Sequence, residues 1–382
     1  VDKQAHKLIT AWALFYLNCQ ELEEPERLLL GEEIIEGGIF EYFYRLIITD
    51  IKPPVFYKIK DNPDHYKQLT EWVIGQLQPR LQPLGKDFSA RLHVYFLEES
   101  TDKLSRNILE AAHLFASRWE FHLIKGVNPW DEELEEIEEN FESSLRTYSH
   151  LRGVSDLIEG STNPLGRFLH QCGQLRFQKR WSQTPRIPET SVLGHMFIVA
   201  CYAYFFSLAV DATPLRRQNT FFAGLFHDLP ELLTRDIISP VKRSVQGIGD
   251  LIKEYEESEV KRRVFGLLEK GGFQKLSERL AYYLGVGVSS EFANTIQHAG
   301  GIKEISWEDL QENYNRDMFD PKDGKVLKIC DSLAAFIEAY TAMRNGITTD
   351  QLQQAVWRIR SLYAQTTLGE NVHIGGLLAD FD

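Results

Sequence analysis

Residues 225–231 read LFHDLPE, which sets a histidine and an aspartate side by side in an otherwise apolar stretch. A buried imidazole next to a buried carboxylate is costly unless a cation or another polar partner satisfies both. A second histidine, His195, lies upstream, and Asp331 lies downstream in the stretch KICDSL at residues 328–333. With His227 and Asp228 they supply nitrogen and oxygen donors suited to one divalent transition metal. The pattern predicts a metal site assembled from separate helices of a bundle.

The sequence around these residues has helical periodicity. Apolar residues recur at a spacing of three to four over residues 191–210, with Ser191 as the expected N-cap and Pro214 closing the segment. Further helices are predicted at residues 218–229, 251–270, 323–345 and 349–363. The acidic run 132–142 is expected to form a solvated helix face, and the glycine-containing tail after residue 368 is expected to be loosely held. Residues 92–97 have β-like composition but are isolated, so the predicted fold class is all-α.

The length of the chain favours two domains. Its 382 residues exceed the roughly 250–300 residues beyond which single cores usually divide. Composition becomes richer in Pro, Gly, Arg and Gln after Gly160. We therefore expect one helical domain at residues 1–160 and a second, metal-binding domain at residues 161–382.

The two halves also contain similar segments. The stretch DIISPV at residues 236–241 has a counterpart in DIKPPV at residues 50–55, and His6 lies at nearly the same offset from His195. Where the second half has His227 and Asp228, the first half has Glu41-Tyr42. One interpretation is a tandem duplication whose first copy has lost its metal ligands. Chance similarity between two helix-turn-proline segments is the alternative.

The composition of the chain limits the classes of molecule that it is expected to bind. The chain has 42 basic and 55 acidic residues, a net charge of −13, which argues against passive adhesion to a nucleic acid polymer or an anionic membrane. A small phosphorylated substrate is still compatible, because a few local cations suffice for one phosphate. The four cysteines are scattered without CxxC spacing, so no disulfide framework is expected. No apolar run approaches the ~20 residues of a spanning helix and no signal peptide is recognised, so a cytoplasmic protein is expected.

Four protein ligands leave open coordination positions on a five- or six-coordinate ion. A water held there has its pKa lowered toward neutrality, which favours hydrolysis. Histidine and carboxylate ligands suit Mn, Co, Zn, Fe or Ni better than Ca, and the sequence does not choose among them. Glu231 and Asp236 follow the His-Asp pair closely, and either could move a proton. Their alternative roles are a charge at a helix N-terminus for Glu231 and a turn for Asp236.

This constellation resembles the HD-domain metal-dependent phosphohydrolases. The longer pattern from His227 to Lys242, and the Arg180-Trp181 pair before the first histidine, are most similar to the bacterial 5'-deoxynucleotidase branch of that superfamily. The resemblance covers roughly residues 175–346, less than half of the chain. It implies an HD-domain helical bundle, and the first half would then be a degenerate HD-like repeat.

The resemblance also implies roles for individual residues. It implies one divalent metal held by His195, His227, Asp228 and Asp331. Glu231 and Asp236 would assist catalysis, and Arg180, Trp181 and Lys242 would bind the substrate. An arginine can clamp a phosphate through two parallel hydrogen bonds, and a bulky indole beside the sugar would disfavour a 2'-hydroxyl. A surface charge for Arg180 and a buried anchor for Trp181 are the alternatives.

Two departures from the family pattern bear on the substrate. The family commonly has a glutamate before the first histidine, where this chain has Gly194, and the span between His227 and Asp331 contains an insertion within residues 261–320. His298 lies in that insertion and could reach a second metal or the substrate, or be an ordinary surface or core residue.

The predicted function is hydrolysis of the phosphomonoester of deoxynucleoside 5'-monophosphates. One alternative is an HD phosphohydrolase that acts on a dNTP, a cyclic nucleotide or a guanosine polyphosphate. Another is a nucleotide-sensing or scaffolding protein with weak turnover. The expected assembly is a monomer with pseudo-dimeric domains or a homodimer.

Overall fold

The computed structural model describes residues 1–49, 51, 53–97, 103–128, 133–234, 248–298, 300–370 and 372–381. The first half contains α1 (Asp2–Asn18), α2 (Glu24–Ile48), α3 (Pro53–Lys60), α4 (Pro63–Leu81), α5 (Lys86–Leu97), α6 (Leu104–Val127), α7 (Leu134–Arg146), α8 (Val154–Glu159) and α9 (Pro164–Gln174). The second half begins with α10 (Val192–Ala209), α11 (Pro214–Phe226), α12 (Glu231–Thr234), α14 (Ile248–Val260), α15 (Gly266–Lys270) and α16 (Gln274–Tyr283). It ends with α17 (Trp307–Glu312), α18 (Gly324–Arg344), α19 (Asp350–Tyr363) and α20 (Ile374–Ala379).

The predicted all-α fold class is confirmed. Among the described residues, the strands form two short antiparallel pairs. One joins β1 (Thr295–His298) to β2 (Gly301–Glu304), and the other joins β3 (Thr367–Leu368) to β4 (Val372–His373). Both lie within the helical second half and neither forms a larger sheet.

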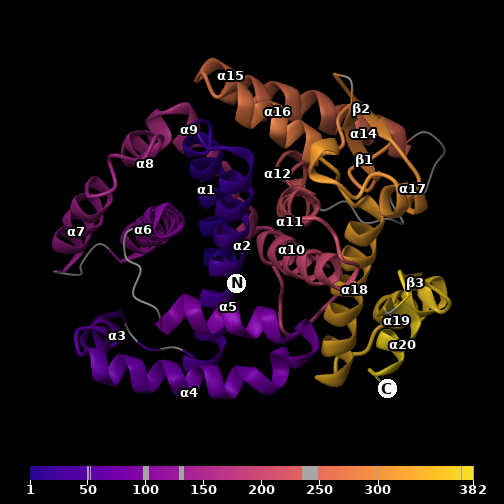
Figure 1. The fold of residues 1–382 in the computed structure, drawn as a ribbon, viewed down its shortest axis with the longest axis horizontal. Coiled ribbons are helices and arrows are strands. Elements are labelled where there is room, and N and C mark those ends of the chain that lie inside the picture. The colour runs from indigo at the N-terminus through magenta and orange to yellow at the C-terminus, as the bar shows by residue number, and fades with distance from the viewer. Residues whose placement is uncertain are drawn as a thin grey trace.

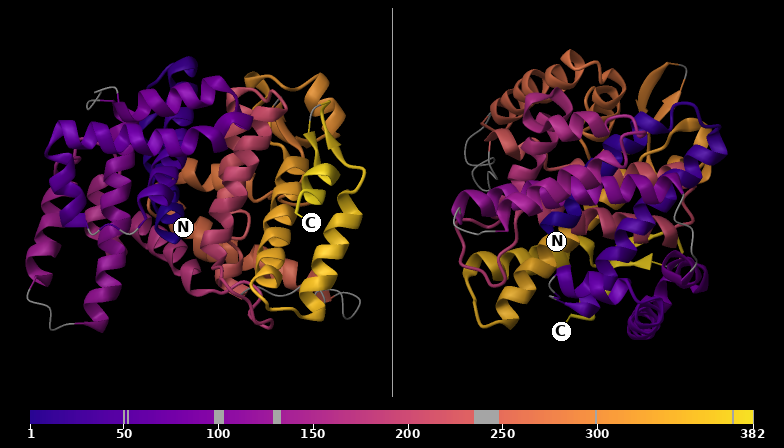
Figure 2. Two further views of the ribbon diagram at one scale, coloured as in Figure 1. Left: turned by 90° about the horizontal axis from the view of Figure 1, so that it is seen from below. Right: turned by 90° about the vertical axis from the view of Figure 1, so that its left-hand side faces the viewer.

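Helix α10 lies at the centre of the molecule. It packs against α11 and α18 of its own half and against α1 of the first half. Figures 1 and 2 show α3 to α7 on one side of this centre and α18 to α20 on the other. The arrangement brings the first turn of α10, the end of α11 and the first half of α18 together.

The two halves share one continuous hydrophobic core. Three aromatic residues of the first half pack against aromatic residues of the second half. Ring centroids are 4.7 Å apart for Trp12 and Phe226, 6.4 Å for Phe15 and Phe222, and 6.1 Å for Phe43 and Phe205. Phe40 and Phe56 contact aromatic rings of the first half: Tyr44, Tyr66, Phe88 and Tyr95. The division at residue 160 stays a prediction.

Capping explains where several helices begin. The Ser191 hydroxyl accepts a hydrogen bond from the Gly194 amide at 2.8 Å, which confirms the predicted start of α10. Pro214 opens α11, because proline fits the first turn of a helix. The helix predicted at residues 218–229 therefore begins four residues earlier and ends at Phe226. The helix predicted at residues 323–345 is α18, with its N-cap at Asp323.

Residues 92–97, whose composition is β-like, belong to helix α5, in which Phe88 and Leu92 stand one turn apart and are both buried. One local prediction is wrong. The tail is packed and not loose: Leu368, Ile374 and Leu378 are all buried in the core. The acidic segment behaves as expected over its described part, since α7 is buried only at Leu134 and Leu145.

Helix α10 corrects the prediction that no apolar run of the chain comes close to the length of a membrane-spanning helix. Its 18 residues are long and apolar enough to cross a membrane by length and composition, but 67% of the segment is buried inside the protein. A helix that is apolar on all faces is typical of a protein core as well as of a membrane span. The four cysteines are free, and all four are buried.

For the proposed duplication, the structure offers one comparison, which is the packing of corresponding helices in the two halves. Helix α1 contacts α2 and α6, just as α10 contacts α11 and α18. Asp50, Lys52 and the whole of the matching stretch 236–241 lie outside the described residues. The duplication stays a prediction.

Candidate metal centre

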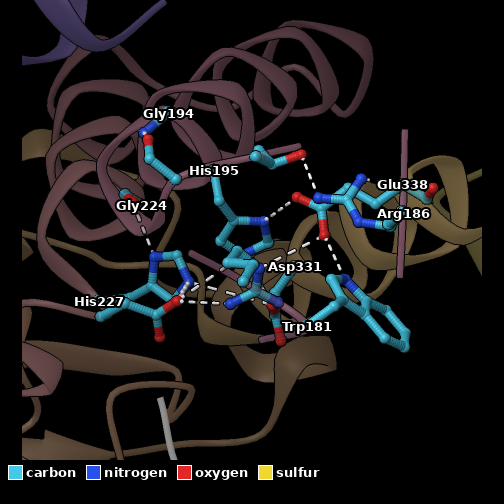
Figure 3. Close-up of polar contacts among 12 residues, drawn as sticks. Trp181, Arg186, Gly194, His195, Gly224, His227, Asp331 and Glu338 are labelled. Carbon is cyan, nitrogen blue, oxygen red and sulfur yellow. Dashed lines mark hydrogen bonds and ion pairs between the residues drawn. The ribbon is translucent and has the colours of Figure 1, made fainter. Parts of the chain in front are cut away.

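Two histidines and two aspartates from three helices converge at the end of α11. His195 comes from α10, His227 is the C-cap of α11 with Asp228 directly after it, and Asp331 comes from α18. The His195 Nε2 atom lies 3.3 Å from Asp331 Oδ1 and 3.8 Å from Asp228 Oδ2. The His227 Nε2 atom lies 3.3 Å from Asp228 Oδ2 and 4.0 Å from Asp331 Oδ1. Each imidazole nitrogen is thus within 4.0 Å of both carboxylates (Figure 3).

The orientation of His227 follows from the way α11 ends. Its Nδ1 donates to the Gly224 carbonyl at 2.8 Å, which leaves Nε2 facing the carboxylates. Gly224 lies where α11 crosses α10, so closely that a Cβ atom would come within 2.9 Å of the Ala200 Cα. The absence of a side chain at residue 224 therefore sets the distance between the two helices that carry the histidines.

Gly224→Ala is expected to destabilise the fold by about 1–3 kcal/mol, because an added methyl group overpacks the contact with Ala200. It should also weaken divalent metal binding, since His227 would move with α11. Chemical denaturation and a metal titration measure the two effects. Gly75→Ala in α4 is the matched control, because a Cβ there meets nothing within 4 Å. The control should stabilise by about 0.5–1 kcal/mol; equal behaviour of both variants would refute the packing argument.

The oppositely charged groups at the centre shift one another's pKa values. Burial alone would lower the pKa of His227, but the carboxylates of Asp228 and Asp331 outweigh it and raise that pKa to about 9. Burial alone would raise the pKa of both aspartates. For Asp228 the charges of His227 and Arg180 overcome burial, and for Asp331 the hydrogen bond from His195 and the charge of Lys328 do so; both pKa values fall below their ordinary range. The two carboxylates are therefore ionised at neutral pH and available to a cation.

These residues fit a divalent metal. Within the part of the chain that the structure describes, the buried Nε2 of His227 has no hydrogen-bond partner, although Asp228 Oδ2 lies 3.3 Å away. A buried nitrogen without a hydrogen bond is costly, and a metal ion would satisfy it. The ligand atoms of His195, His227 and Asp228 all lie within 4.8 Å of one another. Two nitrogen and two carboxylate donors suit a divalent transition metal.

Arg180 and Trp181 lie beside this centre, in the segment that leads into α10. Arg180 Nη1 is 3.2 Å from Asp228 Oδ2, and its Nε is 3.4 Å from Glu338 Oε2. The Trp181 indole nitrogen donates to the same Glu338 oxygen at 2.8 Å. Burial alone would lower the pKa of Arg180, but the surrounding carboxylates, Glu338 first, raise it. Two of the predicted substrate-binding residues, Arg180 and Trp181, thus lie beside the predicted metal ligands, and Arg180 is paired with carboxylates.

The remaining predicted residues lie in different places. Glu231 begins α12, and its amide donates to the Asp228 carbonyl at 3.0 Å. Its carboxylate is one of the charges that raise the pKa of Arg180, so it acts on the same region. Asp236 and Lys242 lie outside the described residues. His298 is exposed on β1, with its ring 5.7 Å from that of Phe319.

The sequence reasoning missed Glu338 and Arg186. Glu338 follows Asp331 by seven residues, two helical turns along the same face of α18. This spacing places Glu338 on the Asp331 face but does not distinguish it from any other polar residue there. Burial alone would raise the pKa of Glu338, but His195 and Arg180 lower it to about 2. Arg186 is buried and donates to the main-chain oxygen of Glu338 at 3.5 Å. It also donates to the Thr190 hydroxyl, which fixes the segment leading into α10.

Residues 172–360 match the family described as HD domain, and this segment contains all four converging side chains. This segment of the second half is therefore similar to HD domains. A solved structure of an HD-domain phosphohydrolase from Listeria innocua is similar at 17% identity and a TM-score of 0.39, over 56% of this chain and 86% of that one. No curated protein matches the chain. The family match supports a metal-dependent phosphohydrolase in general and leaves the substrate open.

Proposed function

We propose that this chain is a metal-dependent phosphohydrolase that cleaves the phosphomonoester of (deoxy)nucleoside 5'-monophosphates. The observation that carries the proposal is the geometry at the end of α11, where two imidazole nitrogens each lie within 4.0 Å of two carboxylates inside an HD domain. When bound there, a divalent metal supplies Lewis acidity toward a phosphoryl oxygen and lowers the pKa of a water.

The residues of the chain would divide the remaining work. His195, His227, Asp228 and Asp331 would hold the ion. Arg180 would bind the substrate phosphate, because a guanidinium offers paired donors to phosphate oxygens and this one stands 3.2 Å from Asp228. A phosphate held by Arg180 would therefore lie next to the metal ligands.

Trp181 would set the preference for the sugar. Its indole nitrogen is fixed on Glu338, and its ring packs against the small cluster formed by Ala339, Ala342 and Leu352. A ring held on both sides cannot easily move aside for a larger ligand. A sugar placed against it would be favoured without a 2'-hydroxyl, which supports the deoxynucleotide preference.

Glu231→Ala is expected to spare metal binding and to lower kcat by roughly 10²–10⁴-fold, the range for a group that moves a proton in the transition state. Glu231 is not a predicted ligand but stands three residues after Asp228. Metal content and steady-state kinetics measure the two effects. Glu257→Ala on α14 is the matched control, because that carboxylate is exposed and lies 3.9 Å from Lys253. Full activity of Glu231→Ala would show that the assigned role is wrong.

A substrate screen tests the proposal itself. The protein is loaded with Mn, Co or Zn separately, and phosphate release is measured from dAMP, AMP, dATP and a cyclic nucleotide. Release from dAMP but not from AMP is the expected result. Cleavage of dATP or opening of the cyclic ester would point to another HD phosphohydrolase activity. No turnover by a fully metallated sample would point to a sensing or scaffolding role.

A further inference from the structure

Glu338 stands behind His195, on the side away from the two aspartates. Its Oε1 lies 3.2 Å from His195 Nδ1, while the other ring nitrogen faces Asp331 and Asp228. Its Oε2 accepts from Trp181 and from Arg180. One carboxylate therefore contacts a predicted metal ligand through one oxygen and both predicted substrate-binding residues through the other (Figure 3).

We propose that Glu338 is a positioning residue that holds His195 ready to bind the metal through Nε2 and fixes Trp181 and Arg180 beside it. The inference rests on the metal site of the proposed function. Glu338 is not one of the four predicted ligands; it contacts His195, Trp181 and Arg180, and it would act through them.

The hydrogen-bond pattern determines the tautomer of His195. The indole of Trp181 and the guanidinium of Arg180 can only donate, so Oε2 of Glu338 is an acceptor. A carboxylate with this oxygen occupied by donors presents Oε1 to His195 as an acceptor too. His195 Nδ1 then carries the hydrogen, and the Nε2 lone pair is directed at the centre. A carboxylate behind a metal-binding histidine both orients the ring and raises its basicity.

The position of Glu338 is itself well supported. Its side chain is 10% exposed, and α18 carries it on the same face as Asp331. Arg186 donates to its main-chain oxygen from the segment that also carries Arg180 and Trp181. Since α18 supplies both a predicted metal ligand and the residue behind His195, a change at Glu338 should affect the metal site and the substrate-binding segment together.

Glu338→Gln separates the charge from the shape. A glutamine amide has one acceptor oxygen and one donor nitrogen. If its oxygen faces His195, its NH₂ group opposes the Trp181 and Arg180 donors; if it is reversed, the NH₂ group opposes Nδ1–H of His195. In either arrangement one of the two functions of Glu338 is lost while the side-chain volume is kept.

The readouts are the Kd for Mn²⁺ by calorimetry and the visible absorption of the Co²⁺-loaded protein. We expect Glu338→Gln to raise the Kd by roughly 10–100-fold and to shift the Co²⁺ spectrum. Glu36→Gln is the matched control: Glu36 is also buried and accepts from Arg91 and Tyr204, but it lies in the first half. Both variants should lose stability, whereas only Glu338→Gln should change the metal readouts. If it does not fold, Glu338→Asp replaces it with the same expectation.

Trp181→Phe tests the second function of the carboxylate. It removes the indole donor to Glu338 Oε2 and keeps an aromatic ring, so we expect a raised KM with an unchanged Kd for Mn²⁺.

A wild-type Kd and Co²⁺ spectrum for the Glu338 variant would overturn the inference. If the wild-type protein binds metal but cleaves no phosphoester, the proposed function fails and the role of Glu338 is still decided by the metal readouts. If the wild-type protein retains no metal, both fail.

Discussion

Asp228→Ala is expected to abolish metal retention and phosphate release together. Asp228 Oδ2 lies within 3.8 Å of Nε2 in both histidines and 3.2 Å from Arg180, so this oxygen is shared by three nitrogen groups. Its removal leaves three of the four predicted donors. It also takes away the largest of the charges that raise the pKa of His227. A site with two buried imidazoles and half of its negative charge should hold a divalent ion poorly.

Metal content after dialysis and phosphate release from dAMP measure this prediction. Asp228→Asn keeps the shape of the side chain and should also lose the metal, because the missing property is the charge. Asp309→Ala is the matched control: this aspartate is exposed on α17, where its side chain accepts from Asn313. Stoichiometric metal in dialysed Asp228→Ala would show that the ligand set is assigned incorrectly.

Much of the centre could be predicted because its signals are local. The His227-Asp228 pair stands out in an apolar stretch, and His195 and Asp331 each lie in an apolar helical pattern. Caps such as Ser191 and Asp323 fix the register of α10 and α18, so the helices that carry the side chains could be predicted too. Their convergence follows from packing of those helices in a bundle.

The surroundings of the centre depend on contacts that no local pattern encodes. Trp181 and Glu338 are 157 positions apart, and their hydrogen bond forms only when the segment before α10 lies along α18. A glutamate two turns after Asp331 has the same sequence signature as any polar residue on a helix face. The pairing of Arg180 with Asp228 and Glu338 likewise depends on tertiary structure.

The substrate, too, could not be predicted from a local sequence pattern. The resemblance to the 5'-deoxynucleotidase branch uses Asp236 and Lys242, which lie outside the described residues, together with Arg180 and Trp181, which the structure places beside the centre. The HD domain match covers the four predicted metal ligands and does not distinguish among phosphoester substrates. The branch therefore depends on the substrate screen.

The second prediction with a large expected effect concerns the aromatic contact between the two halves. Trp12 in α1 is fully buried, and its ring meets that of Phe226 at 4.7 Å, directly before His227 in the chain. It also lies 6.4 Å from the rings of Phe168 and Tyr283. The indole thus packs against aromatic residues on α9, α11 and α16. Deleting it would leave a cavity beside Phe226, the residue before His227.

Trp12→Ala is expected to lower the free energy of unfolding by about 3–5 kcal/mol, the range for removing a buried aromatic side chain. The buried indole nitrogen has no hydrogen-bond partner among the described residues, so its loss offsets part of the cost and favours the lower end. Denaturant unfolding measures the effect. Trp72→Ala in α4 is the matched control, because its side chain is 52% exposed and should change stability by less than about 0.5 kcal/mol.

The shape of the unfolding transition adds a second test. If the halves are stabilised by the core they share, Trp12→Ala should shift a single transition that both circular dichroism and tryptophan fluorescence follow. It should also weaken metal binding, because Phe226 holds the end of α11 that presents His227. Two separated transitions, with the metal-binding one unmoved, would instead mean that residues 1–160 and 161–382 unfold as independent domains. In that case the aromatic contact would contribute little to the metal centre.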